Sequence, residues 1–433
     1  MPSMPAQGLD QVSTAGNMKE LRRFSRNTLI YLSSNILRAA LPFLLLPFLV
    51  RELGPEQYGR IGLITSAFAL LLPVIGLGTH AYVRTMFNRS TEEELRRILG
   101  AATVMVAVAC VVVCLLIFGL GSFVALPLPA ALLVVGALAA FGQKVVSIRL
   151  VLWQMSGRPE PYGLLSVALS LANLLFSIGL VFLAQMQAEG RILGMWLPAV
   201  LAVPLILVPL YRGGHLELSL PRDLVRRMLR FGLPLIPHNL ALLFIVFVER
   251  AVLADDRGGI SLGLFFAAFQ MALPVAILSR SINLQFRAYS ERLMVDGEHR
   301  RVVTSSYGVM AVLAAAALAY AWLLGFVYGA IVGEEMAEGY PIAVMLVFAA
   351  MFRGFYLVVV KGVHFTRRTR PLMGLTLCLS ALFTLLLLQF RDLYAVAWLN
   401  LGFNFALFLC VWILAARLLP QPWLTFLRRE GSD

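Results

Sequence analysis

The sequence predicts an all-α membrane protein, with about 12 transmembrane helices in two six-helix lobes related by a parallel pseudo-two-fold repeat. Composition is the first observation behind this fold class. Hydrophobic residues make up 60% of the 433 residues and charged residues only 14%, whereas soluble domains have about 45–50% and about 25%. Long apolar runs are the second observation, and an internal repeat is the third. A chain with this balance needs the lipid bilayer as its main solvent.

The repeat joins two stretches that lie far apart in the chain. IGLITSAFALLLPVI, at 61–75, aligns without a gap to LGLFFAAFQMALPVA, at 262–276. The identical pairs are Gly62/Gly263, Leu63/Leu264, Ala67/Ala268, Phe68/Phe269, Leu72/Leu273, Pro73/Pro274 and Val74/Val275. A second match pairs Ala139/Ala349, Ala140/Ala350, Arg158/Arg368 and Pro161/Pro371. Each half then holds an even number of spans, so both halves enter the membrane from the same side, as in a parallel transporter repeat.

The apolar runs define the order of the elements. Each is long enough to cross the bilayer as a helix, and a barrel would instead show short alternating strands. The predicted spans are 29–50, 61–83, 99–120, 129–150, 162–184, 192–211, 233–254, 261–283, 302–327, 340–362, 371–390 and 393–416. They are organised as a cytoplasmic tail (1–26), an N-terminal lobe (27–211), an interlobe linker with an amphipathic helix (212–232), a C-terminal lobe (233–418) and a cytoplasmic tail (419–433).

Basic residues predict the orientation of the spans. With the amino terminus in the cytoplasm, most of the 36 Lys and Arg residues fall in or beside cytoplasmic segments, including Arg96, Arg97, Arg300 and Arg301. This bias follows the positive-inside rule and places both termini in the cytoplasm. It also accounts for the net charge of +13 without a nucleic-acid partner, for which no basic domain or zinc pattern is present.

Four basic residues lie inside predicted spans and are candidates for binding a ligand. Arg38 lies near the middle of the first span on a polar stripe with Asn35, and Lys144, Arg280 and Arg353 lie in spans 4, 8 and 10. A charge at this depth is costly and needs a partner, a water-filled cavity or a route to the membrane surface. The alternatives are hydrogen bonding between helices for the polar stripe and snorkelling for Arg280. We expect Asn35, Arg38, Lys144, Arg280 and Arg353 to line a substrate cavity.

Acidic residues inside the predicted spans are few. Glu249 is followed directly by Arg250 near the end of span 7, and we expect these two to form a gating or lobe-closing ion pair. The excess of cations favours an anionic ligand, and the planar fork of arginine suits phosphate. The chain has no Walker motif, dinucleotide fingerprint, HExxH or nucleophile elbow. The sequence therefore predicts no catalytic residues, no cofactor, no metal site and no enzyme activity.

Several short segments resemble a known family. LGPEQYGRIG after span 1, GLGTHAYVR at the end of span 2, GRPEPYG before span 5 and RFGLPLIPHNLALLFIVFVERAVLADDRG around span 7 resemble bacterial oligosaccharide flippases. These form the polysaccharide-biosynthesis branch of the multidrug/oligosaccharidyl-lipid/polysaccharide (MOP) superfamily. The resemblance implies a V-shaped, two-lobed transporter that alternates between inward-open and outward-open states. Where many members have Asp-Arg late in span 7, this chain has Glu249-Arg250, which leaves their pairing open.

The resulting hypothesis is a flippase in the bacterial inner membrane. The resemblance implies that it moves undecaprenyl-pyrophosphate-linked oligosaccharide to the periplasmic leaflet for O-antigen, capsule or exopolysaccharide assembly. Its partners are this lipid-linked glycan and membrane lipids, with ion coupling left open and no nucleic acid. The first alternative is a multidrug or cation antiporter of the same superfamily, which should have a cavity lined by carboxylates. The second is a membrane glycan polymerase or ligase, which should have a large external loop.

Overall fold

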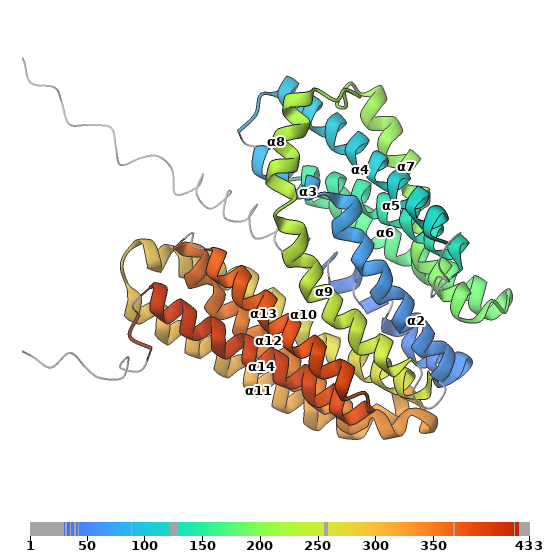
Figure 1. Cartoon of the computed structure of the whole chain (residues 1–433), viewed down its shortest axis with the longest axis vertical. Helices are drawn as coiled ribbons and strands as arrows, with labels where there is room; N and C mark the ends of the chain where they lie inside the picture. Colours follow the sequence, from blue (N-terminus) through green and yellow to red (C-terminus); the bar gives the residue numbers. More distant parts are fainter. Residues whose placement is uncertain are drawn as a thin grey trace, which may run out of the picture. The chain divides into compact units, whose positions relative to one another are not determined.

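Every regular element in the described part of the chain is a helix, as the sequence predicts (Figure 1). The computed structural model describes residues 30, 33–34, 36–38, 40–41, 43–87, 89–121, 129–254, 259–366, 369–419 and 421–423. Its helices are α2 (Leu46–Gly76), α3 (Thr79–Met86), α4 (Glu92–Gly121), α5 (Ala130–Met155), α6 (Pro159–Ile178), η1 (Gly179–Leu183), α7 (Gln187–Arg212), α8 (Arg222–Gly232), α9 (Leu235–Leu253), α10 (Ile260–Val295), α11 (His299–Val332), η3 (Glu334–Gly339), α12 (Tyr340–Phe365), α13 (Thr369–Gln389) and α14 (Leu393–Leu418).

Ten helical stretches in the described residues are long and apolar enough to cross a membrane. They coincide with the predicted spans 2–6 and 8–12, which confirms a multi-pass membrane protein. The predicted seventh span is α9, a helix of 19 residues. The first predicted span lies largely among residues that the structure describes only in part, so its full extent stays a prediction.

The helices group into two compact units. The first contains residues 1–44, 79–178 and 194–229, and the second contains residues 45–78, 179–193 and 230–433. Within the first unit, α5 packs on α3, α4 and α6. Within the second, α12 packs on α10, α11 and α14, and α2 packs on α9 and α10. The predicted six-helix lobes, with their boundary at the 212–232 linker, stay a prediction.

The predicted turn after the first span is a break inside α2 at Gly54. Gly54 has φ 67 and ψ 174, while the residues on both sides are helical. A positive φ is a conformation that glycine adopts at little cost. Pro55 follows directly, and proline is favoured at the first position of a helix because its fixed φ suits the helix and its missing N–H is not needed there. The Gly-Pro pair therefore ends one helical segment and starts the next.

The predicted continuous helix over 61–83 is interrupted in the structure. Leu77 and Gly78 have φ values of 46 and 69, and the N–H of Leu77 donates to the carbonyl of Pro73 to close the end of α2. Gly78 packs directly on Gly232, since a Cβ on Gly78 would lie 2.7 Å from the Cα of Gly232. Two glycines are therefore needed where these backbones meet. The equivalent helix of the repeat, α10, has no such break and continues past Pro274 to Val295.

The amphipathic helix predicted within 212–232 is α8. Leu224 and Met228 are buried and lie one turn apart, so they share a helix face. Arg222, Arg226 and Arg227 are exposed on the remaining surface. An apolar stripe opposite a basic face is the pattern of a helix that lies in the plane of a membrane surface.

Helices α2 and α10 cross at close range in the second unit. A Cβ on Gly59 would lie 2.7 Å from the backbone nitrogen of Gly263, and one on Gly62 would lie 2.6 Å from the ring of Phe266. A Cβ on Gly263 would collide with the carbonyl of Pro55. Small residues allow membrane helices to approach until their backbones touch. Gly62 and Gly263 are repeat-equivalent positions, so the repeat supplies a glycine to each side of this crossing.

This crossing leads to a prediction for Gly59→Ala. The added methyl group meets backbone rather than a movable side chain. We therefore expect overpacking to lower the free energy of unfolding by about 1–3 kcal/mol. Thermal unfolding of the detergent-solubilised protein, followed by tryptophan fluorescence, measures the change. Gly374→Ala is the matched control, because nothing lies within 4 Å of a Cβ there and alanine favours the helix by about 0.5–1 kcal/mol. Equal unfolding temperatures for the two variants would contradict the close approach.

Candidate functional site

The predicted cavity residues of the N-terminal half lie in the first compact unit. Asn35 is outside the described residues. Arg38 is exposed, and its carbonyl accepts a hydrogen bond of 3.1 Å from the hydroxyl of Ser170 in α6. Lys144 is half-buried in α5 and within electrostatic reach of His80. Neither cation has an ion pair with a described residue, and their place in a substrate cavity stays a prediction.

The structure brings two of the predicted cations together in the second unit. Arg353 is half-buried in α12 with its guanidinium 5.1 Å from the ring centroid of Tyr356, and Arg280 in α10 lies close enough to repel it. Neither forms an ion pair within the described ranges. Asn283 fixes the spacing of the two helices, because its side-chain amide donates to the carbonyls of Ser279 (2.9 Å) and Gly354 (3.3 Å).

Two neighbouring guanidinium groups without a carboxylate are an unfavourable arrangement on their own. The repulsion is relieved by an anion, and a phosphate group can accept hydrogen bonds from both forks. The geometry of Arg280 and Arg353 therefore suits an anionic group better than a cationic one.

Glu249 and Arg250 in α9 are both buried, with 1% and 5% of their surface exposed. They bind different partners: the carboxylate of Glu249 accepts from the side-chain amide of Asn400 (2.7 Å), and Arg250 donates to the carbonyl of Gly62 (3.0 Å). Successive residues of a helix do not face each other, so Glu249 points to α14 while Arg250 points to α2. Each residue thus connects α9 to another helix, and their role in gating stays a prediction.

Aromatic rings complete the surroundings of Arg250. Its guanidinium lies 5.1 Å from the ring centroid of Phe266 and 4.9 Å from that of Phe269, both in α10. Tyr58 of α2 packs against Phe266 at 5.0 Å. A cation held over aromatic faces gains electrostatic energy that increases when water is excluded. Arg250 therefore joins α9, α2 and α10 at the glycine crossing, and we call these residues (Tyr58, Gly62, Arg250, Phe266 and Phe269) the arginine clamp.

Sequence reasoning missed the polar residues of α14 that support Glu249. Asn400 donates to Glu249, and Asn404, one turn later, donates to the side-chain oxygen of Asn400 at 3.2 Å. This second bond occupies the acceptor of Asn400 and leaves its NH₂ group directed at the carboxylate. The available signal was the spacing of two amides, four residues apart, in the otherwise apolar segment LNLGFNF.

The described helices define the class of this protein as an all-α, multi-pass membrane protein. In a structural comparison the chain matches an outward-facing multidrug resistance MATE family transporter of the MOP superfamily, with a TM-score of 0.60, 14% identity and coverage of 94% of this chain and 96% of that one. It also matches the eukaryotic MATE transporter AtDTX14, with a TM-score of 0.63, 14% identity and coverage of 92% and 96%. At this identity the likeness defines the fold.

A comparison of the sequence with protein families shows the family of this chain. Residues 24–285 match the model of the polysaccharide biosynthesis protein family, and the chain belongs to that family. A relative, the "Lsg locus putative protein 1" of Haemophilus influenzae, is 24% identical over 286 residues, which are 64% of this chain and 69% of the relative. The predicted membership of the MOP superfamily is confirmed.

The bond between Asn400 and Glu249 leads to a prediction for stability. Asn400→Leu keeps the branched shape of the side chain but leaves a buried carboxylate without its donor, so we expect a loss of about 1.5–3 kcal/mol in the free energy of unfolding. Glu249→Gln removes the charge. In the Glu249→Gln protein, Asn400→Leu should lower the free energy of unfolding by clearly less. The free energies of unfolding of the four proteins form a double-mutant cycle.

A control for this cycle is Asn404→Leu, which removes a hydrogen bond in the same helix without touching Glu249. Asn404→Leu should lower the free energy of unfolding by less than Asn400→Leu does. If Asn400→Leu cost the same with Glu249 and with Gln at that position, the bond would contribute nothing to stability.

Proposed function

We propose that the protein is a flippase for polyprenyl-pyrophosphate-linked oligosaccharide in the bacterial inner membrane, with both termini in the cytoplasm. The observation that carries this proposal is the pair Arg280 and Arg353, which lie on the packed helices α10 and α12, repel each other electrostatically, and have no ion-pair partner among the described residues. A pyrophosphate is the anionic group that the substrate would present to them. Family membership supports the same substrate class, because the product of such transport is assembled into polysaccharide.

Alternating access is the mechanism that we infer for this transport. The arginine clamp and the glycine crossing lie at the end of α2, α9 and α10 that the distribution of basic residues predicts to face outside. A tight helix crossing at this end would close the external side and leave the substrate path open to the cytoplasm. Opening would require Arg250 to leave the carbonyl of Gly62, which makes the clamp a candidate two-state element. Arg38 and Lys144 would contribute further positive charge to the path.

Loss of the cation pair should reduce transport. In a host that lacks its own flippase, we expect the Arg280→Ala/Arg353→Ala protein to assemble much less surface polysaccharide, because each lost charge-assisted contact weakens binding by about 1.5–3 kcal/mol. Surface glycan per unit of membrane-inserted protein is the measured quantity. Arg226→Ala/Arg227→Ala on α8 makes the same change in charge away from the pair and should retain assembly. Full assembly by the first variant would show that the pair does not bind substrate.

Export of a cationic drug is a second candidate function, which the buried carboxylate of Glu249 favours. A carboxylate can attract a cation or exchange a proton during transport. Expression in an efflux-deficient host distinguishes the two functions. If the protein is a flippase, drug resistance should stay at the level of an empty vector while surface glycan assembly is restored. Resistance that is lost in Glu249→Gln, without restored glycan, would favour the antiporter.

A further inference from the structure

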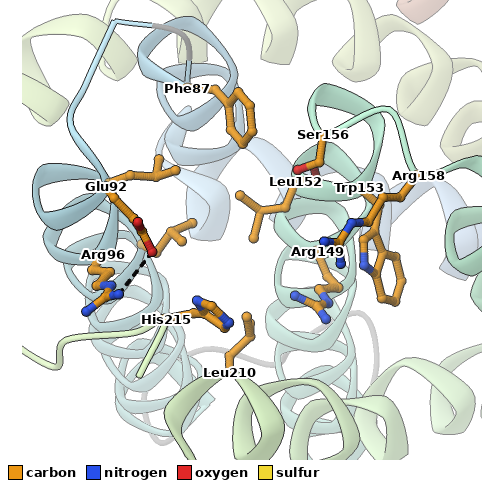
Figure 2. Close-up of a pocket in the computed structure, with 12 residues that line it drawn as sticks. Phe87, Glu92, Arg96, Arg149, Leu152, Trp153, Ser156, Arg158, Leu210 and His215 are labelled. Carbon is orange, nitrogen blue, oxygen red and sulfur yellow. Dashed lines mark hydrogen bonds and ion pairs between the residues drawn. The ribbon is translucent and has the colours of Figure 1, made fainter. Parts of the chain in front are cut away.

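A pocket of about 270 Å³ lies in the first compact unit, and none of the predicted substrate-cavity residues lines it. It is formed where α4 begins and where α5 and α7 end, which is the side predicted to be cytoplasmic. Its polar lining includes Glu92, Arg96, Arg149, Ser156, Arg158 and His215, and Trp153 adds an aromatic ring. Figure 2 shows the Arg96–Glu92 pair on one side of the pocket and Arg149, Trp153 and Arg158 on the other, with His215 between them.

The lining of this pocket has an excess of positive charge. Three arginines face a single carboxylate, that of Glu92, and Arg96 already binds it at 3.0 Å. Arg149 and Arg158 lie close enough to repel each other, and neither has an ion pair or a side-chain hydrogen bond with a described residue. Two adjacent guanidinium groups are therefore left without a counter-charge at the wall of a concave site.

The position of Arg149 is fixed by Trp153, one turn further along α5. The guanidinium lies 4.3 Å from the centroid of the indole ring, a spacing typical of a cation–π contact. An arginine that only extends to water from a membrane helix does not need a partner of this kind. The stacking holds one charge at the pocket wall, where Arg158 of the following segment joins it.

We propose that this pocket binds a phosphate-bearing ligand. The two guanidinium groups offer planar donor forks that match phosphate oxygens, and His215 and Ser156, which also line the pocket, can add further contacts. The volume is below the usual range of about 300–1,000 Å³ for pockets that hold drug-sized molecules. It fits a head group rather than an oligosaccharide. Either an anionic phospholipid of the inner leaflet or a free phosphate could supply this chemistry.

This inference does not depend on the proposed transport function. None of Arg38, Lys144, Arg280 and Arg353 lines the pocket, so the two sets of cations can be changed separately. A negative result for phosphate binding would not affect the flippase proposal, and a negative result for transport would not affect the proposal of phosphate binding.

Binding to the purified full-length protein in a neutral detergent tests the proposal. The probes are short-chain phosphatidic acid, short-chain phosphatidylcholine as a zwitterionic control, and inorganic phosphate, with affinities measured by calorimetric titration. We expect Arg149→Gln/Arg158→Gln to weaken phosphatidic acid binding by about tenfold or more, which corresponds to the loss of a charged hydrogen bond. The matched control is Arg226→Gln/Arg227→Gln, which removes the same charge from the basic face of α8 outside the pocket. Because exposed charges contribute little to binding at one site, it should weaken phosphatidic acid binding clearly less than the pocket variant does.

The probes also identify the source of the ligand. Specific loss of phosphatidic acid binding, with no binding of inorganic phosphate, supports a lipid head group, whereas specific loss of inorganic phosphate binding supports a soluble ligand. Equal loss in the pocket variant and the α8 control, or no loss in either, would overturn the proposal.

If the glutamine variant does not fold, Arg149→Lys/Arg158→Lys keeps both charges and removes the forks. It should weaken binding severalfold, while Arg226→Lys/Arg227→Lys should not. An unchanged affinity in the pocket lysine variant would then overturn the proposal.

Discussion

The bond between Arg250 and the carbonyl of Gly62 is the interaction on which the second unit depends. It occurs inside a membrane protein, where an isolated guanidinium is costly, so the charge is stable only with partners on several sides. Gly62 supplies the carbonyl, and Phe266 and Phe269 supply aromatic faces. The partners come from α2 and α10, so one side chain of α9 stabilises both helices together with their glycine crossing.

The glycine crossing and the arginine clamp depend on each other. Without side chains at Gly59 and Gly263 the helices approach until their backbones are in contact. Only at that distance can Arg250 reach a carbonyl of α2 and the rings of α10 at once. A change that separates the helices therefore also removes partners from a buried charge, and the cost of separation rises steeply. This interdependence is the basis of our proposal that the arginine clamp acts as a two-state element.

The sequence predicted the helices well and the polar contacts poorly, for different physical reasons. Long apolar runs are a local property, so the spans after the first and the helix α8 followed from composition and spacing. The break at Leu77 was missed because it depends on a neighbour, Gly232, that is distant in the chain. Glu249 and Arg250 were expected to form a gating or lobe-closing ion pair, which stays a prediction. Their hydrogen bonds to Asn400 and Gly62 were missed, because these partners lie on other helices, far away in the chain. Asn400 became visible as a partner only when α14 was placed beside α9.

The arginines differ in their partners rather than in their residue type, and this difference separates structural from ligand-binding charges. Arg250 is 5% exposed and contacts a carbonyl and two aromatic rings within the protein, so these contacts join helices. Arg280, Arg353, Arg149 and Arg158 have no carboxylate partner among the described residues, and each lies beside another guanidinium. Holding like charges together costs energy in the empty state, and a bound anion returns that energy. By our proposals, each pair binds a phosphate group. Arg280 and Arg353, on α10 and α12, would bind it in the substrate path, and Arg149 and Arg158 would bind it at the membrane surface.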